Sequence, residues 1–260
     1  TDGFDPSTGT VTFYEGKDQN LRGAERVDLG TVVINKDSND INVITNVRVD
    51  GPTTHTSETI VNIADSDTLT FSNNATLAAG PGGFGIDRNY KVSGTENLAG
   101  VLNKEFNNSG GTQSFEYPLA VDTLYNPATL EIDGSYSGVP SLSVQLNAAK
   151  HPQRISENIL KKYWTVGQEN ISSLNTMDFT FDYNIPEDTS GNAPRDYPSL
   201  YKPSNEWEMD LGTNPTAFPD EINSVNSIYF EGDWTAGESN AFFLGRNYYS
   251  RNTGDWDIPS

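Results

Sequence analysis

Three short runs within residues 30–50 decide the fold class: Gly30-Thr31-Val32-Val33-Ile34-Asn35, Ile41-Asn42-Val43-Ile44 and Asn46-Val47-Arg48-Val49-Asp50. In each run apolar residues alternate with polar ones, and valine, isoleucine and threonine dominate. This composition and period are typical of half-buried β-strands. Asparagine, aspartate and glycine separate the runs, and these residues favour turns. The stretch therefore predicts three short strands joined by tight turns.

The same pattern extends in both directions along the chain. Upstream and downstream runs of this kind lie at residues 9–13, 59–63, 67–71, 114–119, 128–132, 142–146, 162–166, 177–183 and 227–230. Turn residues recur every ~8–12 positions, which indicates an all-β fold. Helical spacing occurs only at residues 155–161, which could form one or two turns of helix.

The runs divide into two regions. Residues 1–88 carry short, evenly spaced strands, which fit either a β-solenoid-like stack or a small β-sheet. Residues 89–238 carry the six to eight longer strands of an antiparallel β-sandwich. Near the end of the first region, residues 80–85 (Gly-Pro-Gly-Gly-Phe-Gly) are predicted to form a turn. Residues 239–260 are predicted to be a linker and the start of a following module.

Charge and cysteine content narrow the partners. Thirty-six acidic residues against sixteen basic ones give a net charge of −20. This charge opposes binding to nucleic acid and to anionic lipid, which carry the same sign. The chain has no cysteine, so it has no disulfide and no thiolate metal site. No apolar run approaches the ~20 residues of a membrane span, so we expect no membrane insertion.

Asp-rich loops are the candidate metal sites. Asp37, Asp40, Asp65 and Asp67 lie in two loops dense in aspartate and asparagine, and calcium takes six to eight oxygen ligands of this kind. Neither loop has the twelve-residue spacing of a calcium-binding loop. Asp and Asn also favour turns through bonds to their own backbone, which is the competing interpretation. Calcium is the only cofactor that the sequence suggests.

The aromatic residues suggest a second kind of site. Trp207, between two glutamates on a proline-rich connection, is the best candidate for an exposed platform that stacks on a sugar ring. Trp164 and Trp234 lie in strand-like segments and are expected in the core. His55 and His151 lie in polar, turn-like stretches without a serine partner motif, so we expect them at the surface and predict no enzyme.

The order of several motifs resembles a known family. These motifs are Phe115-Glu116-Tyr117-Pro118-Leu119, Tyr125-Asn126-Pro127-Ala128-Thr129-Leu130, Lys162-Tyr163-Trp164-Thr165-Val166, Asp178-Phe179-Thr180-Phe181-Asp182-Tyr183 and Gly232-Asp233-Trp234-Thr235-Ala236-Gly237-Glu238. They are similar to the repeated β-module of very large surface proteins that the type IX secretion system of Bacteroidetes exports. Leu119 and Ala120 depart from the family, which tends to have Val-Gly there.

The resemblance implies a secreted, cell-surface protein, adhesive or filamentous, without chemistry in this module. It also implies that Tyr248, Tyr249 and Trp256 open the next unit and form an interface with neighbouring modules of the same protein or with another copy. Thr68 and Thr123 follow aspartate and precede leucine, as O-glycan acceptors do in such proteins. The alternative function is a carbohydrate-binding module of a secreted glycan-processing enzyme, with a glycan or another surface ligand as partner.

Overall fold

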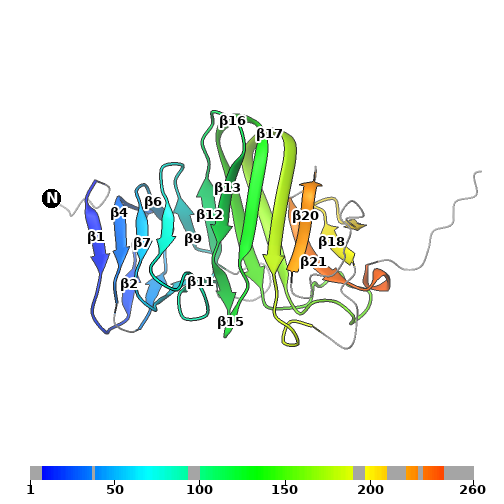
Figure 1. Cartoon of the computed structure of the whole chain (residues 1–260), viewed down its shortest axis with the longest axis horizontal. Helices are drawn as coiled ribbons and strands as arrows, with labels where there is room; N and C mark the ends of the chain where they lie inside the picture. The colour runs from blue at the N-terminus through cyan, green and yellow to red at the C-terminus, as the bar shows by residue number, and fades with distance from the viewer. Residues whose placement is uncertain are drawn as a thin grey trace, which may run out of the picture.

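The computed structural model describes residues 8–36, 39–92, 100–189, 197–209, 221–227 and 231–242. These residues form 21 strands and one short 3-10 helix, η1 (Ser239–Ala241), so the all-β prediction is confirmed. Among them, no helix is long and apolar enough to span a membrane. The strands belong to three sheets. Figure 1 shows the N-terminal strands from β1 at one end of the molecule and the C-terminal strands β18 and β21 toward the other.

Parallel strands make up the N-terminal half. Sheet A contains β1 (Thr10–Phe13), β4 (Thr31–Ile34), β7 (Thr53–His55) and β10 (Leu77–Ala79). Sheet B contains β2 (Gln19–Leu21), β5 (Ile41–Val43), β8 (Ile60–Ile63), β11 (Asn89–Val92), β14 (Leu119–Val121) and β15 (Leu124–Tyr125). Sheet C begins with β3 (Val27–Leu29), β6 (Val47–Val49), β9 (Thr68–Phe71) and β12 (Val101–Glu105).

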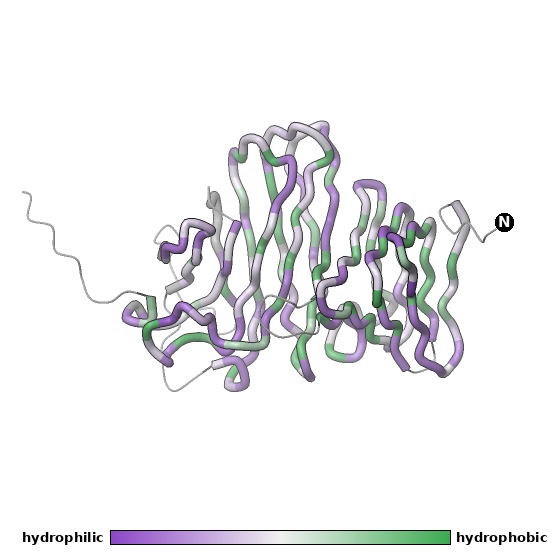
Figure 2. The backbone as a smooth tube through the Cα atoms, turned by 180° about the vertical axis from the view of Figure 1, so that it is seen from behind, coloured by the Kyte–Doolittle hydropathy of each residue, from purple (hydrophilic) through white to green (hydrophobic). Residues whose placement is uncertain are grey.

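Each of the first nine strands pairs in parallel with the strand three places further along the chain. Three successive strands, one in each sheet, therefore make what we call a coil, and four coils run from β1 to β12 (the coil region). Alternation fixes which residues face inward, because successive side chains on a strand point to opposite faces. In β5 and β6, for example, the first and third residues are buried and the middle one is half-buried. Figure 2 shows this alternation of hydrophilic and hydrophobic residues along the coils.

Equivalent side chains stack from coil to coil. On the outside of sheet B, Asn42 donates to Asn20, 22 residues earlier, at 3.0 Å, and Asn62 donates to Asn42, 20 residues earlier, at 3.1 Å. Inside, Ile41 lies level with Val61, and Val43 lies level with Ile63. All four are buried. Neighbouring coils thus share a polar ladder on the surface and an apolar stack in the interior.

The C-terminal half is antiparallel. It contains β13 (Gln113–Tyr117), β16 (Ala128–Asn147), β17 (Tyr163–Asp182), β18 (Tyr197–Tyr201), β19 (Trp207–Met209), β20 (Glu221–Ser227) and β21 (Gly232–Gly237). The two 20-residue strands β16 and β17 pair with each other along their whole length, with register shifts near their middle. At that point Gly134 lies so close to β17 that a Cβ atom would come within 2.5 Å of the Ser173 carbonyl oxygen.

The register shifts divide β16 and β17 between two layers. Their halves at residues 141–147 and 163–169 continue sheet C, between β12 on one side and β21, β18 and β19 on the other. Their halves at residues 128–136 and 171–182 lie between β13 and β20. We call the first set layer 1 and the second layer 2. Strands that change layer through bulges are a known way to turn the corner of packed sheets.

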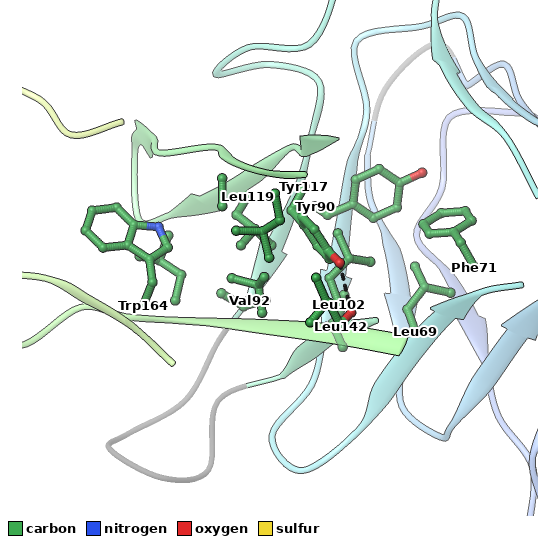
Figure 3. Close-up of a cluster of buried hydrophobic side chains, with 14 of the residues drawn as sticks. Leu69, Phe71, Tyr90, Val92, Leu102, Tyr117, Leu119, Leu142 and Trp164 are labelled. Carbon is green, nitrogen blue, oxygen red and sulfur yellow. Dashed lines mark hydrogen bonds between the residues drawn. The ribbon is translucent and has the colours of Figure 1, made fainter. Parts of the chain in front are cut away.

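The two layers pack face to face. The Trp164 ring in layer 1 stacks on Phe181 in layer 2 with centroids 5.2 Å apart, and Trp234 contacts Phe179 at 4.2 Å. Both tryptophans are buried, as the sequence predicts. One apolar cluster extends from Phe13 in the first coil to these rings. Figure 3 shows its middle part, where the Tyr117 hydroxyl in layer 2 donates to the Leu142 carbonyl in layer 1 at 2.8 Å.

The structure differs from the sequence prediction at residues 155–161. Residues 155–161 form bends and a single β-bridge between Ile159 and Gly237, so the predicted helical turn is wrong. Their apolar residues instead cover the end of β21, where the Leu160 amide donates to Ala236. The boundary predicted between residues 88 and 89 stays a prediction. Strands β11 and β12, which follow it, pair with the coil strands β8 and β9.

Candidate functional site

A groove lies where sheet A stops. Among the described residues β10 pairs only with β7, and β13 pairs only with β16. The chain thus continues the coils in sheets B and C, through β14 and β16, but places β13 in layer 2 instead of beside β10. The space between these two strands is a groove of about 520 Å³. Its lining residues are Asn73, Ala75, Thr76, Leu77, Phe84, Lys104, Glu105, Phe106, Gln113, Ser114, Phe115 and Glu116.

The walls of this β10–β13 groove are partly aromatic. Phe84 and Phe115 are half-buried, and each packs on a ring of the core. Phe115 contacts Tyr117 at 4.9 Å between ring centroids, and Phe84 contacts Tyr90 at 6.3 Å. Leu77 on β10 is also half-buried and packs against the same core. The groove therefore presents apolar side chains that the surrounding sheets cover only in part.

Lys104 brings a buried cation to the groove. Its side chain comes from β12, is 7% exposed, and donates from Nζ to the carbonyls of Ser72 at 2.6 Å and Ala75 at 2.7 Å. Nζ also lies 5.5 Å from the centroid of the Phe115 ring. Burial lowers the pKa of Lys104 to about 8, against the opposing effect of Glu105. A lysine ammonium has three N–H donors, and these two carbonyls take two of them.

A second buried lysine shows a different arrangement. Lys36 Nζ donates to three acceptors: the carbonyls of Glu15 at 3.0 Å and Lys17 at 2.5 Å, and the Gln19 side-chain oxygen at 3.3 Å. All three of its donors are used inside the protein. Among the described residues, Lys104 Nζ has two carbonyl acceptors and the Phe115 ring nearby.

Arg88 holds the glycine-rich turn that carries Phe84. Its guanidinium is largely buried and donates to five backbone carbonyls, those of Thr56, Ser57, Gly80, Pro81 and Gly83, at 2.7–3.2 Å. Nη1 bonds to the three carbonyls of the glycine-rich turn, and Nε and Nη2 bond to Ser57 and Thr56, so the guanidinium ties the turn to the segment that follows β7. The turn predicted at residues 80–85 is confirmed. Phe84 is thus placed at the groove by a fixed backbone.

The candidate calcium residues lie on the turns of the coils. Asp40 accepts a bond from Asn62 Nδ2 at 2.9 Å, and Asp65 is exposed in a turn closed by the bond from the Asp67 amide to the Ala64 carbonyl. Partial burial raises the pKa of Asp67. Asp37 lies outside the described residues. Within them, no group of three His, Asp or Glu side chains gathers as a metal site requires. Calcium binding stays a prediction.

Trp207 lies within an aromatic cluster. It is half-buried, its Nε1 donates to the Gln153 carbonyl at 3.1 Å, and its ring contacts His151, Tyr201 and Phe242 at centroid distances of 4.7–5.1 Å. Neighbouring rings therefore cover part of the indole that was expected to offer a platform. Sugar binding at this tryptophan stays a prediction, which a glycan array with the Trp207→Ala variant would test.

Both histidines are buried, so their predicted surface placement is wrong. His151 is 1% exposed; its Nε2 lies 3.0 Å from Asp233 Oδ2, and its Nδ1 accepts from the Gln153 amide. Asp233 also accepts from the Thr165 hydroxyl at 2.6 Å. His55 is fully buried in the coil interior, and neither ring nitrogen has a hydrogen-bond partner among the described residues. Tertiary packing buries both rings, although their polar neighbours in the sequence indicated a surface position.

The remaining predicted residues are distributed over the molecule. Thr68 lies half-buried in β9, and its amide donates to the Asn46 side chain. Thr123 is exposed in the tight turn between β14 and β15. The predicted interface residues Tyr248, Tyr249 and Trp256 lie outside the described residues. Glycosylation and the tail interface stay predictions.

The sequence reasoning missed a buried ion pair in the C-terminal half. Lys162 Nζ lies 2.8 Å from Asp188 Oδ1, and their side chains are 5% and 1% exposed. Asn126 bonds to both partners, and the Asn184 amide donates to Asp188 at 2.8 Å. Burial lowers the pKa of Lys162. No local pattern marks Lys162 or Asp188, because the partners are far apart in the chain.

No family model matches the sequence, and no curated protein or solved structure matches it either.

Proposed function

We propose that this chain is a non-enzymatic structural or adhesive module of an extracellular, cell-surface protein. In this proposal the coil region is a β-solenoid, the two antiparallel layers are a β-sandwich, and the whole serves as a stiff spacer that associates with neighbouring modules or with a second copy. The motif order that resembles type IX-exported surface proteins gives the cellular setting of the proposal.

The single observation that supports it most is the continuity of sheet C. This sheet runs from β3 in the first coil through β12, β16 and β17 to β19 at the other end. The coil region and the antiparallel region therefore share both a hydrogen-bonded sheet and one apolar core. A body of this kind resists bending between its parts, because any bend would break ladder bonds and expose the core.

The first coil supplies the surface for association. Strands β1, β2 and β3 each stand at the end of their sheet among the described residues. Half-buried Val11, Leu21 and Val27 pack on the core behind them. Free strand edges with apolar side chains between them favour pairing with another chain. In stacked-repeat proteins, such contacts between neighbours supply much of the stability.

Sedimentation velocity over a wide concentration range tests this proposal. We expect reversible self-association of the full chain, weakened by Val11→Lys, which places a charge in the contact face. Thr12→Lys is the matched control, because Thr12 is exposed on the same strand, and we expect it to leave association unchanged. A tandem of two copies should also melt at a higher temperature than one copy. A chain that stays monomeric throughout, with no gain in the tandem, would contradict the proposal.

A further inference from the structure

We propose that the β10–β13 groove is a binding site for an extended peptide, which enters as an additional strand between β10 and β13. The ligand is a short segment of a partner protein with apolar residues on one face and basic residues on the other. This site is separate from the association of modules through the first coil, and its test is independent of that proposal.

Topology supplies the first argument. Sheet A, with strand order β1-β4-β7-β10, ends at β10 among the described residues, and layer 2 begins at β13; residues of both segments line the groove. Layer 1 is continuous past the same point, because β12 pairs with both β9 and β16. Layer 1 therefore has a hydrogen-bonded strand, β12, at this level, whereas the side formed by sheet A and layer 2 has the groove. An added strand would make that side continuous as well.

Backbone groups supply the second argument. The Thr76 carbonyl and the Gly80 amide of the β10 segment bond to Thr53 and His55 of β7. Backbone groups alternate in direction along a strand, so those of Leu77 and Ala79 point away from β7, and Leu77 is also one of the residues that line the groove. Strand addition uses such a row of main-chain donors and acceptors for affinity, and side-chain pockets for specificity.

The side chains define the chemistry of the ligand. Half-buried Leu77, Phe84 and Phe115 would receive the apolar residues of the entering strand, and the remaining donor of Lys104 would bond to one of its carbonyl oxygens. Exposed Glu116 lies at the same groove, together with Glu105, which pairs with Arg48 at 2.8 Å, on a chain with a net charge of −20. Basic residues on the outer face of the peptide would complement this charge.

Fluorescence anisotropy with a labelled six-residue peptide that alternates valine and lysine tests the proposal. We expect saturable binding, and binding at least about tenfold weaker for the same peptide with N-methylated valines, which lacks the ladder donors. In the complex, hydrogen exchange of the Leu77 and Ala79 amides should slow. Equal binding of the methylated peptide, or unchanged exchange at these two amides, would overturn the proposal.

A pair of tryptophan variants localises the site. Ser114 is exposed on β13 and lines the groove, so Ser114→Trp should fill the groove and weaken binding at least about tenfold. Thr12→Trp, on the exposed face of β1 in sheet A, should bind the peptide like the unmodified protein. Thermal unfolding checks that both variants are folded. If Ser114→Trp binds normally, or if neutral oligosaccharides bind in a Ser114-dependent way while the peptide does not, the peptide proposal is wrong.

Discussion

The coil region and the antiparallel region bury ionisable groups in different surroundings. In the coil interior, His55 packs against Phe84 and Tyr90 with no partner for its ring nitrogens among the described residues, and burial with the nearby Arg88 charge lowers its pKa to about 4. In the antiparallel region, the side chains of Lys162 and Asp188 are both buried and pair with each other at 2.8 Å. The buried cations of the coil region, such as Lys36 and Lys104, bond to backbone carbonyls, whereas the buried cation of the antiparallel region is paired with a buried carboxylate.

This difference follows from the two topologies. A coil places each strand beside its equivalents in the coils before and after, so its interior receives side chains from few directions and is mainly aliphatic. Strands β16 and β17 cross both layers, and the connections around them bring segments distant in sequence together, such as Asn126, Lys162 and Asp188. Among the described residues, only the second arrangement brings a buried carboxylate to a buried cation. Substitutions in the two regions test this difference in how buried groups are stabilised.

Removal of one partner of the buried ion pair should have the largest effect. Asp188→Ala leaves the Lys162 ammonium buried without its counter-charge, which typically costs about 3–5 kcal/mol. We expect the free energy of unfolding, measured by urea titration, to fall by that amount.

The double variant Lys162→Met with Asp188→Leu is the control, because it removes both charges and keeps similar side-chain volume. It should recover most of the lost stability, since apolar replacements of buried pairs are often neutral. A double variant as unstable as Asp188→Ala would show that packing, and not the unpaired charge, causes the loss.

A cavity in the coil interior should have the next largest effect. Ile63 is fully buried between its neighbours on β5 and β11, so Ile63→Ala should lower the free energy of unfolding by about 2–4 kcal/mol. Because one apolar core joins the regions, we expect a single unfolding transition at lower urea concentration. Two separate transitions, followed by tryptophan fluorescence and by far-UV circular dichroism, would show that the coils unfold on their own.

Acidification should destabilise the coil region through His55. Its pKa is about 4 in the folded chain and about 6.5 when unfolded, so the unfolded chain binds the proton first as the pH falls. The stability is therefore fully present above pH 6.5 and decreases toward pH 4, by up to about 3 kcal/mol.

The matched variant His55→Leu cannot titrate at this position. Its unfolding free energy should fall less than that of the unmodified protein between pH 7 and pH 4.5, and the difference between the two curves isolates His55 from the many carboxylates. Parallel curves would show that the His55 ring is not held neutral by its surroundings.

The outer polar ladder should have the smallest effect. Asn42→Ala removes the bonds to both Asn20 and Asn62 on a surface that water reaches, so the loss should be about 1 kcal/mol or less. Asn103→Ala is the comparison, because the Asn103 side chain on sheet C makes one weak contact, to Thr70 at 3.5 Å. This substitution should lower the free energy of unfolding by less. Equal losses would mean that the stacked amides add nothing beyond strand propensity. Thermal melts resolve differences of this size.

The sequence predicted a good part of the strands but little of their pairing. Alternation at residues 31–34 and 47–49 marks the strands and their inward faces directly. Asn20, Asn42 and Asn62 are spaced by 22 and 20 residues. This spacing indicates stacked coils, which the number and length of the strands do not indicate by themselves. Gly134, Gly138 and Pro140 separate the two runs predicted at residues 128–132 and 142–146, but nothing local shows that one strand, β16, joins them and enters a second layer.

The candidate site was less predictable still. Lys104 and Phe115 belong to ordinary strand patterns, and nothing local shows that β13 leaves the position beside β10. The surface placement predicted for His55 and His151 was wrong for the same reason, because polar neighbours in the sequence say little about which face of the fold a ring occupies.

By itself, the sequence determined the all-β class, the acidic surface, the inward alternation of each short strand and the burial of Trp164 and Trp234. These properties depend on side-chain chemistry and on a period of two residues, which are local. The tertiary structure alone decided that sheet A ends at β10, that Lys104 lies beside a groove, and that Lys162 meets Asp188. Each of these depends on which distant strands pair, and pairing reflects the free energy of the whole core instead of any one segment.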